Sequence, residues 1–78
     1  MILKYRVPSY YLKSYDNKKV IYCKIVKTTE ALDKKVYLVK MLNLYNISNI
    51  FGDYELENLN LLDKIKLLFI KKESKNGH

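Results

Sequence analysis

The sequence predicts a small, mostly β domain of four or five short strands, arranged as a closed or partly closed OB-like or SH3-like barrel. Several short segments alternate apolar and polar residues or are rich in β-branched residues, as strands with one buried face are. The 78 residues suffice for one core, and 49% hydrophobic residues with two glycines and one proline predict a folded chain. Closure into a barrel would remove the exposed sheet edges.

Residues 1–7 are predicted to form the first strand, because Leu3, Tyr5 and Val7 alternate with more polar positions. Pro8 ends this strand, since proline has no amide hydrogen to donate to a neighbouring strand. Residues 9–19 contain three tyrosines and a turn-like Asp-Asn pair, which predicts an exposed loop.

Residues 20–27 give the clearest strand pattern, with Ile21, Cys23 and Ile25 on one face and Tyr22 and Lys24 on an outer face. Residues 35–42 fit both a strand and a helix. We favour a strand, because it would pair with 20–27 as a hairpin through residues 28–35. Three asparagines among apolar residues at 43–52 predict an irregular segment that ends in a turn at 52–53.

The last third of the chain is the most ambiguous part. Residues 54–58 suggest a short exposed strand, and the apolar run from Leu67 to Ile70 favours a strand over 61–72. The same segment also fits a helix capped by Asn60 with Asp63 in its first turn. The alternative fold is therefore a compact α+β unit with helices at 29–45 and 60–72.

One domain is expected over residues 1–73, followed by a disordered tail at 74–78. A single cysteine, Cys23, allows no intramolecular disulfide and indicates a reducing compartment. The N-terminal residues carry Lys4 and Arg6, unlike the apolar centre of a signal peptide, so a cytoplasmic location is expected.

The charge balance favours an anionic partner. Fifteen basic residues oppose eight acidic ones, for a formal net charge of +7, and only Arg6 among the bases is an arginine. Lysine is a point charge that lacks the bidentate geometry with which arginine recognises guanine, so contact with a nucleic-acid backbone is favoured over base readout. An AT-rich genome would also enrich lysine through its codons, which offers an explanation without a functional role.

Tyrosines are interleaved with lysines in the first half of the chain. Aromatic rings stack on bases without sequence preference, so this pattern predicts a surface for single-stranded DNA or RNA. The competing interpretation is that these tyrosines belong to the core or pin loops to it. The residues predicted to bind nucleic acid are Lys4, Arg6, Tyr10, Tyr11, Lys13, Lys18, Lys19, Tyr22, Lys24 and Lys27.

Nothing in the sequence favours catalysis, a metal or a cofactor. Covalent catalysis needs a nucleophile beside a base, but the only histidine is the terminal His78, and Cys23 is flanked by Ile21 and Ile25 on its predicted face. We therefore expect a non-enzymatic binding protein.

Other partners are also considered. A protein-interaction module, such as a virus- or plasmid-encoded inhibitor or adaptor, would also explain the small size and the uneven charge, and a homodimer would enlarge a small core. No membrane partner is expected. Attachment to an anionic membrane would require residues 60–72 to form an amphipathic helix.

Overall fold

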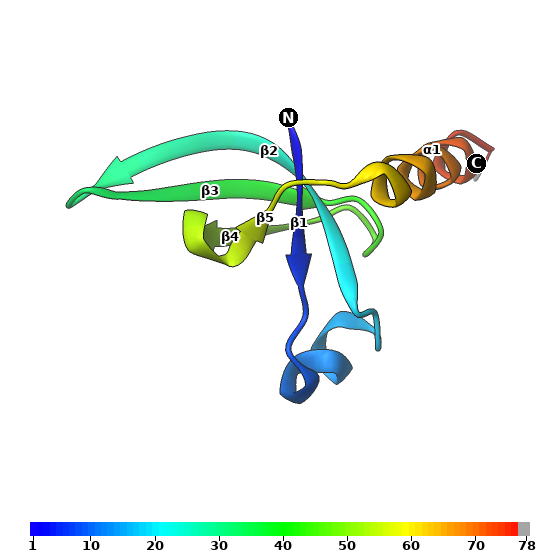
Figure 1. Cartoon of the computed structure of the whole chain (residues 1–78), viewed down its shortest axis with the longest axis horizontal. Coiled ribbons are helices and arrows are strands. Elements are labelled where there is room, and N and C mark those ends of the chain that lie inside the picture. The colour runs from blue at the N-terminus through cyan, green and yellow to red at the C-terminus, as the bar shows by residue number, and fades with distance from the viewer. Residues whose placement is uncertain (77–78) are drawn as a thin grey trace.

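The computed structural model describes residues 1–76, with side chains through residue 70. Its strands are β1 (Ile2–Arg6), β2 (Val20–Ala31), β3 (Lys34–Met41), β4 (Ile47–Gly52) and β5 (Leu56–Glu57). They form one antiparallel sheet in the order β4-β3-β2-β1-β5 (Figure 1). Its helices are the 3-10 helices η1 (Ser9–Tyr15) and η2 (Asp53–Glu55) and the α-helix α1 (Leu61–Asn76). The predicted small, mostly β fold is confirmed.

The sheet is strongly curled but does not close. In the described part of the chain β4 and β5 are its two edges and do not pair, so the closed barrel is wrong. The three residues of η2 nevertheless connect these edges. In a flat sheet β1 and β4 would lie about 14 Å apart, three strand spacings, whereas the rings of Tyr5 and Phe51 stack with centroids 4.3 Å apart.

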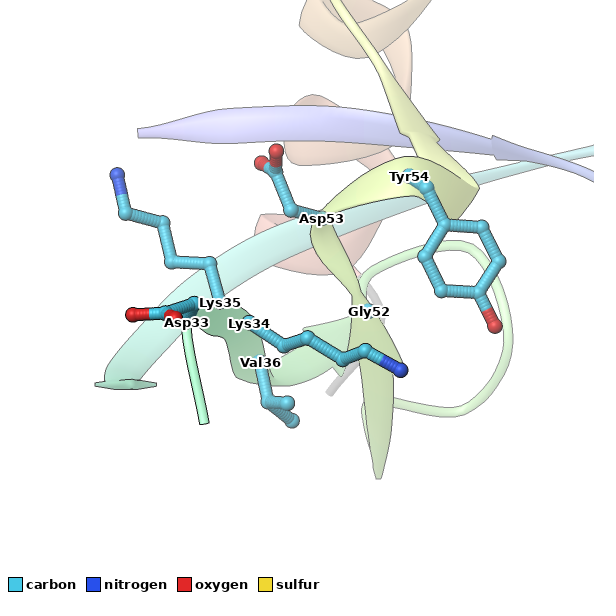
Figure 2. A pocket seen from close by; sticks show the side chains of 7 residues that line it. All are labelled: Asp33, Lys34, Lys35, Val36, Gly52, Asp53 and Tyr54. Carbon is cyan, nitrogen blue, oxygen red and sulfur yellow. The ribbon is translucent and has the colours of Figure 1, made fainter. Parts of the chain in front are cut away.

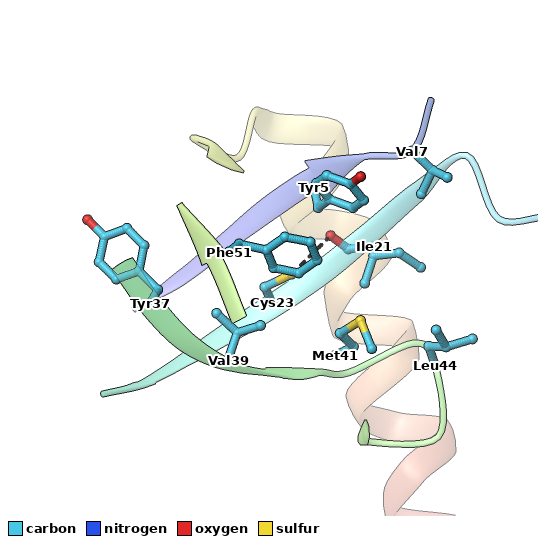
Figure 3. Close-up of a cluster of buried hydrophobic side chains, with 9 residues drawn as sticks. All are labelled: Tyr5, Val7, Ile21, Cys23, Tyr37, Val39, Met41, Leu44 and Phe51. Atoms are coloured by element: carbon cyan, nitrogen blue, oxygen red, sulfur yellow. Dashed lines mark hydrogen bonds between the residues drawn. The ribbon is translucent and has the colours of Figure 1, made fainter. Parts of the chain in front are cut away.

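The core lies on the concave face of this sheet (Figure 3). Register places Tyr5 opposite Ile21 and Cys23 opposite Met41, so that these side chains share one face. The buried cluster consists of Tyr5, Val7, Ile21, Cys23, Tyr37, Val39, Met41, Leu44 and Phe51. The predicted inner face of residues 20–27 therefore lies in this cluster, with Ile21 and Cys23 fully buried and Ile25 packed against it.

The strands predicted at 1–7, 20–27 and 35–42 correspond to β1, β2 and β3, although β2 continues to Ala31. The alternative helix at 29–45 is wrong, because this range contains the β2–β3 hairpin. The irregular segment at 43–52 is also wrong over its second half. There β4 pairs with β3 from Ile47 opposite Met41 to Gly52 opposite Val36.

Residues 61–72 form part of α1, so the predicted strand is wrong and the alternative helix is correct. A local cap explains this outcome. The Asn60 side-chain oxygen accepts the Asp63 N–H at 2.8 Å, and the Asp63 carboxylate accepts the Asn60 N–H at 3.0 Å. The helix continues to Asn76, so residues 74–76 of the expected tail have helical backbone. Residues 77–78 lie outside the described residues.

Helix α1 lies on the convex face of the sheet, behind the core cluster in Figure 3. Asp63 contacts Lys4 of β1 and Tyr22 of β2, whose side chains point away from the core. Leu67, one turn later, is the only other buried residue between residues 61 and 70. Within residues 1–76, no helix is long and apolar enough to cross a lipid bilayer.

Candidate nucleic-acid interface

Two of the predicted binding residues lie inside the protein. Lys4 and Tyr22 are 6% and 4% exposed, respectively. The Lys4 ammonium lies 2.6 Å from the Asp63 carboxylate, and the Tyr22 hydroxyl donates to the same carboxylate at 3.1 Å. Burial and this hydrogen bond raise the pKa of Tyr22 to about 12. The expected exposed outer face at Tyr22 is therefore wrong, because α1 covers that part of the sheet.

Arg6 is exposed but already has an anionic partner. Its Nε and Nη2 atoms donate to the two carboxylate oxygens of Glu57 at 3.1 and 3.2 Å. Hydrogen bonding from Arg6 lowers the pKa of Glu57 below its usual value. The one guanidinium of the chain is therefore occupied at the β1–β5 edge.

Lys24 and Lys27 lie exposed on the convex face of the β2–β3 pair. Lys24 is directly opposite Lys40 in the register, and Lys27 is opposite Leu38. Like charges placed directly across a sheet repel each other, so an anion beside Lys24 and Lys40 would relieve an unfavourable contact. These lysines form a basic strip on the sheet.

The other predicted residues belong to the segment that contains η1. Leu12 and Tyr15, three residues apart, pack against the core and so anchor one face of this 3-10 helix. Tyr10 and Tyr11 then face outward, 78% and 48% exposed. Their ring centroids lie 4.6 Å apart, with the rings tilted by 58°. Lys13, which is also exposed, follows Tyr10 by one turn of the same 3-10 helix.

A depression of about 380 Å³ adjoins Tyr11 and Tyr15. Its size falls in the lower part of the range for small-ligand pockets. The Asn49 side-chain amide donates to the Tyr15 hydroxyl at 3.4 Å at this site. The depression is lined by Tyr11, Ser14, Tyr15, Met41, Leu44, Ile47 and Asn49.

Tyr45 is an exposed aromatic residue in this region that the sequence analysis missed. It lies between Leu44 and Ile47, which line the depression, and its hydroxyl donates to Asp16 at 3.5 Å. Tyr45 and Asn46 both have positive φ, 56° and 55°. A left-handed backbone conformation is energetically unfavourable for a tyrosine. The Tyr-Asn pair was the available turn signal in the sequence.

We call this region the tyrosine end of the molecule. It comprises η1, the adjoining depression and the loops around them, and Lys18 and Lys19 follow η1 on the way into β2. Lys13 and Lys19 are exposed and Lys18 is half-buried. Against these cations the segment holds one acid, Asp16, so the tyrosine end combines aromatic surface with a positive charge. Its side chains are Tyr10, Tyr11, Lys13, Tyr15, Lys18, Lys19 and Tyr45.

A second depression of about 310 Å³ lies beside the β2–β3 turn (Figure 2). The exposed Tyr54 ring covers Gly52 so closely that a Cβ at that position would lie 2.6 Å from it. Lys34 and Lys35 line this depression together with Asp33 and Asp53. Because two acids offset the two lysines, this site fits a polyanion less well than the tyrosine end.

The thiol of Cys23 is buried in the core and is not accessible to solvent. Burial raises its pKa to about 12, which keeps it protonated and unreactive at neutral pH. Among residues 1–76, no three histidine, cysteine or carboxylate side chains come together as metal ligands would.

No family model, curated protein or solved structure matches this chain. Its architecture and surface define a small, basic, mostly β domain with an aromatic and cationic end.

Proposed function

We propose that this protein is a non-catalytic module that binds single-stranded DNA or RNA at the tyrosine end. The observation that carries this proposal is the exposed pair Tyr10 and Tyr11 beside an aromatic depression and lysines of the same segment. Large aromatic side chains are usually buried at least in part. Here two adjacent rings are held outward, because Leu12 and Tyr15 anchor the opposite side of η1.

Binding would combine base stacking with neutralisation of phosphates. Stacking on an aromatic side chain contributes about 1–3 kcal/mol per base and tolerates any sequence. Lys13, Lys18 and Lys19 would contact phosphates and release counterions, which makes affinity fall with salt. With Arg6 paired to Glu57, little base-specific hydrogen bonding is expected. Single strands are favoured over duplex, because bases in a duplex are stacked on one another.

The basic strip on the convex face adds a second region of positive potential. Lys24 and Lys40 face each other across β2 and β3, and no acid is paired with either in the sheet register. Their contribution is long-range attraction of a polyanion, since the strip lacks an exposed tyrosine. Substitutions in the two regions should therefore distinguish the contribution of base stacking to affinity from that of charge.

The test is fluorescence anisotropy of a labelled oligonucleotide of about 20 nucleotides, titrated at about 50 and 200 mM salt with single-stranded and duplex competitors. We expect micromolar or tighter binding that weakens at least about tenfold across this range. Single strands should compete better than duplex. Equal competition by duplex would show that binding depends on lysine charge alone and not on base stacking. Absence of binding at the lower salt would contradict the proposal and favour a protein partner.

A further inference from the structure

Helix α1 exposes a set of large apolar side chains that the proposed nucleic-acid site does not use. Between residues 61 and 70 only Asp63 and Leu67 are buried. The exposed side chains are 44–74% accessible, far more than a core-facing helix stripe would be. They are Leu61, Leu62, Ile65, Leu68 and Phe69.

These five residues form one stripe along the helix. At 3.6 residues per turn, positions 61, 65, 68 and 69 follow the i, i+4, i+7, i+8 pattern, and with position 62 they span an arc of about 120°. Lys64 and Lys66 project on the two sides of this arc, and both are exposed. The outer face of residues 61–70 therefore holds apolar residues bordered by cations and has no acid.

The opposite side of α1 is fixed to the protein's own sheet. The Asp63 carboxylate is bound to Lys4 and Tyr22, and Leu67 is buried on the same side one turn later. The cap formed with Asn60 fixes the start of the helix. Helix α1 thus cannot turn its apolar stripe inward without breaking a buried ion pair, so the stripe remains available to a partner.

The charges beside the stripe favour an anionic surface over a second copy of the chain as its partner. A second copy docked stripe to stripe would bring Lys64 and Lys66 of both copies together, with a net charge of +7 on each chain. Like charges brought together at an interface oppose association. An anionic surface instead attracts these lysines. A planar surface also needs only one free side of a helix, and one side is free here.

We propose that α1 docks the protein on the surface of an anionic lipid bilayer, a partner that the sequence alone did not lead us to expect. The apolar stripe enters the boundary between headgroups and acyl chains, as interfacial amphipathic helices do. Lys64 and Lys66 extend their ammonium groups to the lipid phosphates, while their methylene chains cover the edges of the stripe. The helix then lies in the plane of the membrane surface, with the sheet above it.

The test is co-sedimentation of the whole protein with vesicles of phosphatidylcholine alone or with about 30% phosphatidylserine, at about 0.15 M salt. We expect binding to the anionic vesicles only. The triple variant Leu61→Ser, Leu68→Ser, Phe69→Ser should bind at least about tenfold more weakly. The matched control is Leu32→Ser, which replaces a leucine 95% exposed at the β2–β3 turn and should bind as the parent does.

Further variants test the electrostatic half of the proposal. Lys64→Gln and Lys66→Gln should each weaken vesicle binding about fivefold, since a lysine near an anionic surface contributes about 1 kcal/mol. Lys34→Gln, at the distant turn, is the control. Circular dichroism checks that each variant is folded, and single-strand binding by the triple variant should equal that of the parent.

Several results would overturn the proposal. These are absence of vesicle binding, equal binding to uncharged vesicles, or full binding by the folded triple variant. A dimer seen by analytical ultracentrifugation without lipid, and abolished in the triple variant, would assign the stripe to a second copy instead. None of these results depends on the tyrosine end, so failure here leaves the nucleic-acid proposal to its own test.

Discussion

Lys4 and Asp63 form a buried ion pair, 2.6 Å between Nζ and Oδ2, that joins the first strand to the last helix across 59 positions of sequence. The same carboxylate accepts the Tyr22 hydroxyl and the Asn60 N–H. The Asp63 side chain thus accepts hydrogen bonds from Lys4 of β1, Tyr22 of β2 and the backbone at the start of α1. The docking of α1 on the convex face depends on this carboxylate.

Asp63→Ala is expected to destabilise the protein by about 3–5 kcal/mol, because it leaves the Lys4 charge buried without a partner. Urea denaturation followed by circular dichroism measures the loss. Glu30→Gln, which removes an exposed carboxylate charge near the end of β2, is the control and should change stability by less than about 0.5 kcal/mol. A similar small effect for Asp63→Ala would contradict the structural role given to this pair.

Stability should fall in acid for the same reason. The N–H of Asn60 and then the ammonium of Lys4 lower the pKa of Asp63 below its usual value. A carboxyl group with a lowered folded-state pKa stabilises the protein above its unfolded pKa, about 3.9. This stabilisation disappears as pH falls through the folded-state pKa. Urea midpoints measured from neutral pH down to about pH 3 should therefore decline less steeply for Asp63→Asn than for the parent.

The β2–β3 turn offers a stabilising substitution. Leu32 and Asp33 both have positive φ, 52° and 63°, the conformation of a type I′ turn. Asparagine and glycine suit these positions, whereas a leucine is strained there. The pair Leu32→Asn, Asp33→Gly should raise the free energy of unfolding by on the order of 1 kcal/mol. Thermal denaturation checks this prediction, and a lower midpoint would contradict the turn geometry.

Cys23 provides a probe of the core. Its thiol is fully buried with a pKa raised to about 12, so a disulfide reagent at pH near 8 should label the native protein only at the rate of unfolding. In concentrated urea the same thiol should react at once. Labelling of the native protein at the rate seen in urea would show that the concave face is not packed as described.

Much of the sheet could be predicted from the sequence because its strands carry local patterns. The alternation of Ile21, Cys23 and Ile25 fixed both the strand and its buried face. The segment 61–72 was ambiguous, because the run from Leu67 to Ile70 satisfies a strand as well as a helix. The local cap at Asn60 decides in favour of the helix.

The candidate site was harder to predict, because exposure depends on what covers each strand. Lys4 and Tyr22 lie on the outer face of their strands, as their positions indicate, but α1 covers that face. No local pattern shows where a distant helix will dock. Tyr10 and Tyr11 lie exposed, as expected, since the short helix that carries them is anchored from its other side. Tyr45 was not predicted as a site residue because the asparagines around it indicated only an irregular segment.

The most direct measurement compares single-strand affinity of the parent with that of Tyr10→Ala and Tyr11→Ala at low salt. The account predicts that each substitution weakens binding at least about fivefold, the lower limit for loss of one stacked base. Tyr54→Ala removes an exposed ring outside the tyrosine end and should bind as the parent does. Unchanged affinity in folded Tyr10→Ala and Tyr11→Ala variants would contradict the tyrosine end as the binding site.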